Sequence, residues 1–286
     1  MDLKNKICIV TGANSGIGKV TALEIAKMGA TVIMVCRSKE KGEKALEEVK
    51  NISNNKNVEL MLCDFASQKS IRDFAEQFKS KYKSLHILVN NAGLIISDKS
   101  ITKDGIESTF AINHLGYFLL TNLLLDLLKS SEPSRIVNVS SDGHKIGHID
   151  FDDLNYEHKK YSSMKAYCDS KLANILFTKE LSKRLKGTNV TANCLHPGAI
   201  NSNFAYNMTG FMGNIVKLIK PLLNIVLTTV EKGAETQIFL ATSPEVEGVT
   251  GEYFSKKRIA STNNEAKDKN VAERLWQVSE DMVKTK

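Results

Sequence analysis

Short apolar runs alternate with longer amphipathic stretches along most of the chain. Six runs rich in β-branched residues are typical of strands, at residues 6–10, 31–36, 58–63, 86–90, 135–140 and 190–196. They are almost continuously apolar, as expected for strands buried on both faces of a parallel sheet. A last short run at residues 251–254 predicts one more strand at the sheet edge.

The stretches between these runs have the spacing of helices, at residues 16–28, 39–52, 68–82, 105–128 and 163–185. Strands and helices in alternation indicate a parallel sheet with helices on both faces, and right-handed crossovers make it doubly wound. We therefore predict an α/β protein, a single-domain Rossmann fold with a doubly wound parallel sheet of about seven strands. No linker or repeat interrupts residues 1–286, and residues 264–286 form a predicted C-terminal helical tail.

Composition and charge exclude several classes of protein. The net charge of +7 is compatible with binding to nucleic acid, to an anionic membrane or to a phosphate-bearing ligand, or simply with a lysine-rich surface. The lysines are dispersed among acidic residues without interleaved aromatic residues, so we expect no nucleic-acid binding. No uninterrupted apolar stretch reaches about 18 residues, so no transmembrane segment is expected.

The cysteines and the first residues bear on the compartment. The five cysteines form no CxxC pair, and four of them lie in strand-like runs, which is typical of buried reduced thiols. The opening "MDLKNKICIVTG" has no apolar signal region. We expect a cytoplasmic protein.

A glycine-rich segment, "TGANSGIGK", directly follows the first predicted strand and opens a helix. Gly12, Gly16 and Gly18 let the backbone approach a pyrophosphate, and free N–H groups at the helix start bind its charge. The alternative is a tight turn without a ligand. The position between strand and helix favours a dinucleotide site.

The end of the second predicted strand discriminates between the two nicotinamide dinucleotides. An acidic residue there would bind the ribose 2′-hydroxyl of NAD, whereas this chain has Arg37, whose guanidinium suits the 2′-phosphate of NADP. The alternative is a solvated loop charge. After the third strand, Asp64 could accept a hydrogen bond from an adenine amino group or could cap a helix.

Tyr167 and Lys171 lie four residues apart, on one face of a predicted helix. A nearby ammonium favours the phenolate and lowers the tyrosine pKa, which makes the phenol an acid/base near working pH. Ser141 follows a buried strand, at the edge where open sheets build their sites. Asn113 lies in an apolar helix, so its amide must be paired, and a water bridge towards Lys171 is one such pairing.

Five segments, "TGANSGIG", "NNAG", "SS", "YCDSK" and "HPG", follow one another in the order and spacing typical of one family. The chain thereby resembles the short-chain dehydrogenases/reductases, closest to the NADP-dependent retinol dehydrogenase-like group. The resemblance implies that Tyr167 is the general acid/base, that Lys171 lowers its pKa and binds the nicotinamide ribose, that Ser141 holds the substrate oxygen and that Asn113 anchors a proton relay. It implies a cofactor-binding set of Gly12, Asn14, Ser15, Gly16, Ile17, Gly18, Arg37, Asp64, Phe65, Asn91, Ala92, Gly93, Tyr167, Lys171, Pro197, Gly198, Ile200 and Ser202.

The expected function is NADP(H)-dependent interconversion of a carbonyl and an alcohol on an apolar small molecule, without a metal. The alternative is a catalytically idle NADPH-binding regulatory protein, although such relatives usually lose the Tyr or the Lys that this chain has. Residues 203–229 predict a lid over the substrate, with a core helix or a peripheral membrane contact as alternatives. Apolar surface on helices 105–128 and 163–185 predicts a homodimer or homotetramer.

Overall fold

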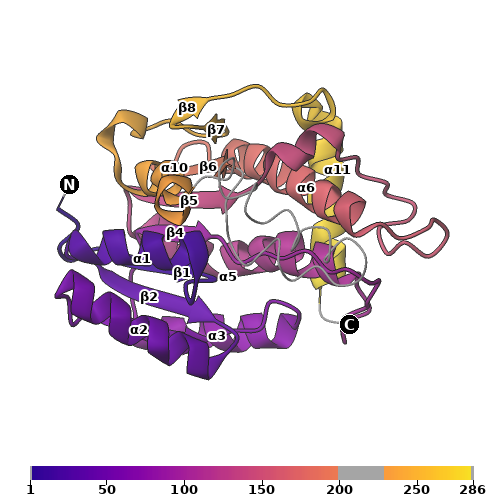
Figure 1. The fold of residues 1–286 in the computed structure, drawn as a ribbon. Coiled ribbons are helices and arrows are strands. Elements are labelled where there is room, and N and C mark those ends of the chain that lie inside the picture. Colours follow the sequence, from indigo (N-terminus) through magenta and orange to yellow (C-terminus); the bar gives the residue numbers. More distant parts are fainter. Residues whose placement is uncertain (1, 199–228, 285–286) are drawn as a thin grey trace.

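The computed structural model describes residues 2–198 and 229–284, which Figure 1 shows as a central sheet covered by helices. Within these residues the sheet has eight strands. They are β1 Ile7–Thr11, β2 Thr31–Cys36, β3 Val58–Leu62, β4 Ile87–Asn90, β5 Ser134–Val139, β6 Val190–His196, β7 Tyr253–Ser255 and β8 Arg258–Ile259.

The strand order is β3-β2-β1-β4-β5-β6-β7-β8. Every pair from β3 to β7 is parallel, and β8 adds at the edge as an antiparallel strand. The predicted doubly wound sheet of about seven strands is confirmed, with β8 as a short addition. The chain first winds outward to β3 and then returns to place β4 on the other side of β1. This reversal opens a crevice beyond the carboxyl ends of β1 and β4, where ligands of such sheets bind.

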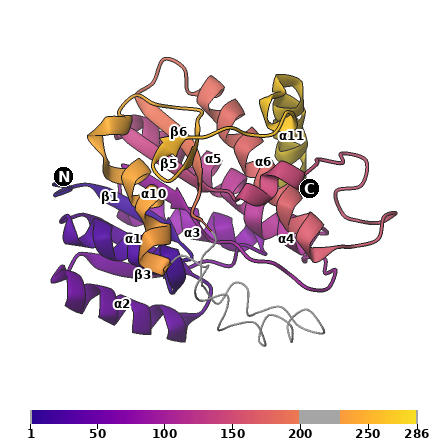
Figure 2. The ribbon, with the colours of Figure 1, turned by 45° about the horizontal axis from the view of Figure 1, so that its top comes forward.

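The helices lie on both faces of the sheet (Figure 2). One face carries α1 Gly16–Lys27, α2 Lys39–Ser53 and α10 Val230–Thr242. The other carries α3 Gln68–Lys81, α5 Gly116–Ser130, α6 Ser163–Arg184 and α11 Lys269–Val283. Shorter elements are α4 Ser108–Phe110, a π-helical turn Ala111–Leu115, and 3-10 turns Asp142–Ile146, Pro244–Val246 and Glu265–Lys267.

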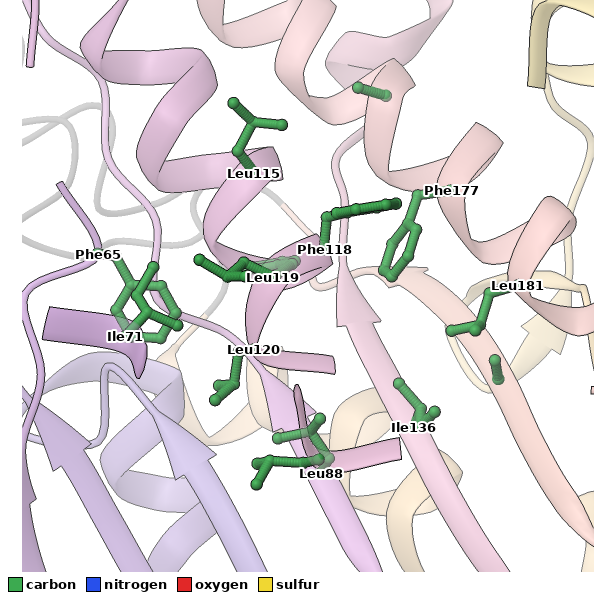
Figure 3. Packing of buried hydrophobic residues seen from close by; sticks show 14 of the residues in the cluster. Phe65, Ile71, Leu88, Leu115, Phe118, Leu119, Leu120, Ile136, Phe177 and Leu181 are labelled. Atoms are coloured by element: carbon green, nitrogen blue, oxygen red, sulfur yellow. The ribbon is translucent and has the colours of Figure 1, made fainter. Parts of the chain in front are cut away.

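Two apolar cores hold these layers together, one on each face of the sheet. Alternate residues of a strand enter opposite cores, so Ile9 packs in the first, and Cys8 and Val10 in the second. Figure 3 shows the first core, where Phe118 of α5 meets Phe177 of α6 with ring centroids 5.5 Å apart. Each such buried side chain contributes about 1.5–3 kcal/mol, so these contacts rigidly place the strands that carry the site.

The segment predicted as one helix over residues 105–128 is divided in the structure. The carboxylate of Glu107 accepts the N–H groups of Thr109 and Phe110, so the first helical turn begins there. The π turn Ala111–Leu115 then interrupts the regular bonding before α5 continues. A side-chain pattern alone does not reveal such an interruption.

Helix α10 has no counterpart among the predicted elements. Its buried face includes Gly233, Thr236 and Gln237, and the Gln237 amide donates to the Thr21 hydroxyl of α1 at 2.8 Å. Small and polar side chains on the buried face leave only a weak apolar periodicity. Packing against α1, which Figure 2 shows next to it, therefore stabilises this helix more than its own apolar periodicity does.

One helix of the described segments, Ser108–Ser130, has the length and apolar composition needed to cross a membrane. However, 72% of its apolar window is buried inside the protein. Its leucines belong to the core against α3 and α6. The helix is therefore accounted for as a core helix.

Candidate active site

A cavity of about 590 Å³ opens at the carboxyl ends of the strands. Loops after six strands line it, from the glycine turn after β1 to Pro197 and Gly198 after β6. All the residues predicted to bind cofactor that fall within the described ranges lie in its wall, namely Gly12, Asn14, Ser15, Gly16, Ile17, Gly18, Arg37, Asp64, Phe65, Asn91, Ala92, Gly93, Tyr167, Lys171, Pro197 and Gly198. Ile200, Ser202 and nearly all of the 203–229 lid lie outside the described residues.

The glycine turn fits closely against the loop after β4. Gly12 has a φ of +67°, and a Cβ there would lie 2.9 Å from the Ala92 Cα. A Cβ on Gly18 would lie 2.4 Å from both the Gly12 oxygen and the Asn91 side-chain nitrogen. The Asn91 amide also donates to the Thr11 oxygen at 2.7 Å, which locks the two loops together. Only glycine fits these two positions.

The start of α1 has free hydrogen-bond donors. Its N-cap, Ser15, makes no side-chain capping bond, and the first turn carries no acidic residue. The first backbone N–H groups of a helix have no partner within the helix, and the helix dipole adds partial positive charge. This cradle therefore fits the pyrophosphate of a dinucleotide.

Arg37 follows β2 at the rim of the cavity and is exposed. Among the described residues, no carboxylate pairs with its guanidinium. Asp64 also lines the cavity, and its Oδ1 accepts the backbone N–H of Ala66 at 3.0 Å. The cap of α3 is Ser67 rather than Asp64, so helix capping does not explain this aspartate.

Ser141 and Tyr167 meet in the cavity wall. The Ser141 hydroxyl interacts with the Tyr167 phenol and lowers its pKa, and its oxygen accepts the N–H of Gly143 at 3.1 Å. Removal from water raises the pKa of Tyr167 to about 12, and the bond to Ser141 offsets part of that rise. The expected lowering of this pKa by Lys171 is therefore not found in this structure.

The surroundings of Lys171 give the physical reason. Its ammonium donates to the Val139 oxygen at 3.1 Å and lies 5.6 Å from the Tyr167 ring centroid. The side chain is 3% exposed, and burial lowers the pKa of Lys171 to about 7. Removal from water thus disfavours the charged form of Lys171, the form that would lower the pKa of the phenol.

Asn113 lies in the π turn behind the cavity rather than in its wall. Its side chain accepts the N–H of Leu94 at 2.9 Å and donates to the Leu94 oxygen at 2.9 Å and to Ser170 at 3.1 Å. The expected pairing of the buried amide is confirmed by these bonds to Leu94 and Ser170, and the water bridge towards Lys171 stays a prediction. A Cβ on Gly93 would lie 3.2 Å from the Asn113 Oδ1 and 3.3 Å from the Lys171 Nζ, so Asn113 and Lys171 flank the same glycine.

Comparison with known proteins agrees with this geometry. A family model described as short chain dehydrogenase matches residues 6–210. The chain belongs to the short-chain dehydrogenase/reductase family.

Curated and structural relatives place the chain further within this family. Retinol dehydrogenase 13 of Homo sapiens is 45% identical over 283 residues, which cover 98% of this chain and 85% of the relative. Retinol dehydrogenase 11 of Mus musculus is also 45% identical, and the match covers 99% of this chain and 88% of that relative. A crystal structure of an uncharacterized protein from Mycobacterium paratuberculosis superposes with a TM-score of 0.79 at 34% identity, covering 100% of this chain and 96% of that one. The predicted resemblance to retinol dehydrogenases is confirmed.

The predicted set omits several residues of the site in this dehydrogenase/reductase. His196 lines the cavity, and its Nδ1 accepts the Asp142 N–H at 3.3 Å, next to Ser141. Its place directly before Pro197 was a signal that could have identified it. The further members of the wall are Cys36, Cys63, Leu94, Ile95, Ile112, Val139, Ser140 and Val230.

The two serines of the pair have different surroundings. Ser140 is buried, and its hydroxyl donates to the Lys171 oxygen at 2.7 Å, which ties β5 to α6. The Ser141 hydroxyl instead lowers the pKa of Tyr167 in the cavity wall. The sequence pattern "SS" does not separate these two environments. All five cysteines are buried free thiols, as predicted.

Proposed function

We propose that the chain is an NADP(H)-dependent oxidoreductase that interconverts a carbonyl and an alcohol on an apolar, retinol-like substrate. The observation that carries this proposal is that Ser141, Tyr167 and Lys171 line the same cavity as the glycine turn, with Ser141 lowering the pKa of Tyr167. A proton donor and a hydride carrier would thus share one cavity. The family relationship supports an oxidoreductase of this kind.

In the proposed mechanism, the bound nicotinamide supplies or accepts the hydride. Tyr167 donates the proton to the carbonyl oxygen during reduction and removes it during oxidation. Ser141 holds the same oxygen by a hydrogen bond. Lys171 binds the nicotinamide ribose, and Asn113 keeps the loop at Leu94 in place.

The protonation state of Tyr167 matches the proton donor that carbonyl reduction needs. Its pKa is raised to about 12, so the phenol keeps its proton throughout the physiological pH range. A protonated phenol is the form that donates to a carbonyl oxygen. Oxidation of the alcohol would need the phenolate, which becomes abundant only at higher pH.

Two features support the cofactor and substrate classes. Arg37 stands where an acid would select NAD, and no described carboxylate neutralises it. Leu94, Ile95 and Ile112 give the cavity an apolar part of its wall. The name of the human relative points to retinol as an example of an apolar alcohol.

Cytoplasmic location and a homodimer or homotetramer stay predictions. A peripheral membrane contact through residues 203–229 is an alternative to the lid, and these residues fall outside the described ranges apart from Thr229.

The decisive experiment is a panel of aldehydes and ketones, including retinal, with NADPH or NADH consumption followed by absorbance. We expect turnover of apolar aldehydes with NADPH. Binding of NADPH without turnover of any compound would instead support the alternative of an idle NADPH-binding regulatory protein.

Arg37→Asp tests the cofactor preference. It removes a charge-assisted contact of about 1.5–3 kcal/mol, so NADPH should bind at least tenfold more weakly in a fluorescence titration. Lys83→Asp, at an exposed position just before β4, makes the same charge change at the opposite edge of the sheet and should leave binding unchanged. Equal affinity of the wild type for NADH and NADPH would show that Arg37 does not select the cofactor.

A further inference from the structure

The C-terminal helix α11 packs across α5 and α6, and Figure 1 shows it alongside α6. Trp276 of α11 stacks on Phe177 of α6, with centroids 5.8 Å apart, and meets Phe118 of α5 edge-on at 4.9 Å. Arg184 lies over the outer ring face of Trp276 at 4.3 Å. The helix is thus fixed on the outer side of the elements that carry Asn113 and Lys171.

One buried hydrogen bond links α11 to the π turn. The Nε2 of His114 lies 2.9 Å from the Ser279 hydroxyl oxygen, and both residues are fully buried. The Ser279 hydroxyl donates its proton to the Leu275 oxygen at 2.7 Å. Its oxygen must therefore accept from His114, which places the imidazole proton on Nε2. Burial lowers the pKa of His114 to about 3, so the ring is neutral.

The residue before His114 is Asn113, whose side chain points to the other side of the same turn. Asn113 binds the N–H and the oxygen of Leu94, and its own backbone oxygen accepts from Asn174 at 2.9 Å. The backbone of a π turn bonds residues five apart, as the Gly116 N–H does to the Ala111 oxygen, and such turns are rare, so side-chain bonds on both sides help to hold it. Asn113 makes the bonds to the loop at Leu94, and His114 makes the bond to Ser279 of α11.

We propose that Ser279 is a positioning residue for the active site, because its bond to His114 holds the π turn that places Asn113. The proposal rests on the proposed function, since Asn113 in turn holds Leu94 next to the glycine that Lys171 flanks. α11 is then a structural part of the catalytic machinery although none of it lines the cavity. The oxidoreductase would depend on contacts made by its C-terminal helix.

The test compares Ser279→Ala with Val283→Ala, a matched change one helical turn further along α11. Val283 is also buried, and among the described residues its backbone oxygen accepts from Arg72 of α3 rather than from the π turn. Two readouts are taken on the full chain. The first is kcat and KM with NADPH and the best aldehyde of the panel. The second is hydrogen exchange of the Leu94 amide, which reports on Asn113 directly because this amide donates to the Asn113 Oδ1.

For Ser279→Ala we expect a kcat about ten- to a hundredfold lower, as typical for a catalytic group misplaced by a remote change, with little change in KM for NADPH. The Leu94 amide should exchange about five- to tenfold faster, which corresponds to one lost net hydrogen bond. The Ala13 amide of the glycine turn, which donates to the Val35 oxygen, should exchange as in the wild type. Val283→Ala should change neither the exchange rate of the Leu94 amide nor kcat.

A second pair of variants guards against a general loss of structure. His114→Gln keeps an amide donor that can reach Ser279, whereas His114→Leu keeps only the bulk. We expect His114→Gln to retain more activity than His114→Leu, and its Leu94 amide to exchange more slowly. Equal effects of Ser279→Ala and Val283→Ala, or unchanged Leu94 exchange in Ser279→Ala, would overturn it. The exchange arm decides even if no substrate is turned over, so it fails independently of the proposed function.

Discussion

The Tyr167 phenol is subject to two opposing influences. Removal from water raises its pKa and the hydrogen bond with Ser141 lowers it, with a result of about 12. Tyr167→Phe keeps the ring and removes the ionisable oxygen, so we expect turnover to fall by about 10²–10⁴-fold, the usual contribution of acid–base assistance. NADPH binding, measured by fluorescence titration, should stay close to the wild-type value. Near wild-type turnover would rule out Tyr167 as the proton donor.

Lys171 differs from Tyr167 in what its loss should do. Lys171→Met keeps the length of the side chain and removes the ammonium that the mechanism assigns to the nicotinamide ribose. We expect both slower turnover and weaker NADPH binding, so titration separates the two variants even where their rates agree. Unchanged NADPH affinity in Lys171→Met would remove the ribose contact from the mechanism.

His114 makes the stability of the fold sensitive to acid. Burial lowers its pKa from the ordinary 6.5 to about 3, so between these values the unfolded chain takes up a proton that the folded chain does not. Stability therefore falls as the pH drops from about 6.5 towards 3, by at most about 1.4 kcal/mol per pH unit from this group. The free energy of unfolding, measured with denaturant at several pH values in this range, should change less with pH for His114→Gln than for the wild type. The same pH dependence in both proteins would show that His114 does not contribute.

At the scale of elements, the junction of β1, the glycine turn and α1 depends on close contact with the loop after β4. Gly18→Ala would place a methyl group 2.4 Å from the Gly12 oxygen, a backbone atom that cannot move freely. We expect a loss of about 1–3 kcal/mol in stability and clearly weaker NADPH binding, because the turn must shift. Thermal unfolding and cofactor titration measure the two effects.

Gly187→Ala is the control for this change. Gly187 lies in the loop between α6 and β6, has a φ of +87° and has no neighbouring atom within 4 Å of an added Cβ. The variant should lose stability through backbone strain without weakening NADPH binding. A similar loss of affinity in both variants would mean that general destabilisation, and not the pyrophosphate turn, is responsible.

At the scale of the whole molecule, α11 changes the reasoning about oligomers. The dimer or tetramer was predicted from apolar surface on two helices, and much of that surface is covered within the chain by Trp276 and its neighbours. The dimer or tetramer stays the prediction, so light scattering at tens of micromolar should give two or four times the mass of one chain, 31.7 kDa. The mass of a single chain would contradict it and would show that α11 covers the pairing surface.

The strand and helix positions follow closely from apolar periodicity, which is a local property. The strands at residues 31–36 and 190–196 were predicted to the residue, and α1, α2, α3 and α6 to within one residue at each end. Motif spacing likewise placed Tyr167, Ser141 and the glycine turn at one edge of the sheet, because the carboxyl ends of parallel strands meet there. The exceptions are α10 and the π turn. In α10 polar and small residues face the core, and in the π turn the backbone bonds join residues five apart, as the Gly116 N–H does to the Ala111 oxygen.

The amino-acid sequence was sufficient for the fold class, the family and the position of the cavity, since all three depend on local patterns and their order. The proton affinities of Tyr167 and Lys171 depend instead on how much water the surrounding protein removes, which no spacing reveals. The link from Ser279 to His114 joins residues 165 positions apart and exists only because α11 packs against α5 and α6. Desolvation and long-range packing are properties of the folded chain, and they decide the chemistry of this site.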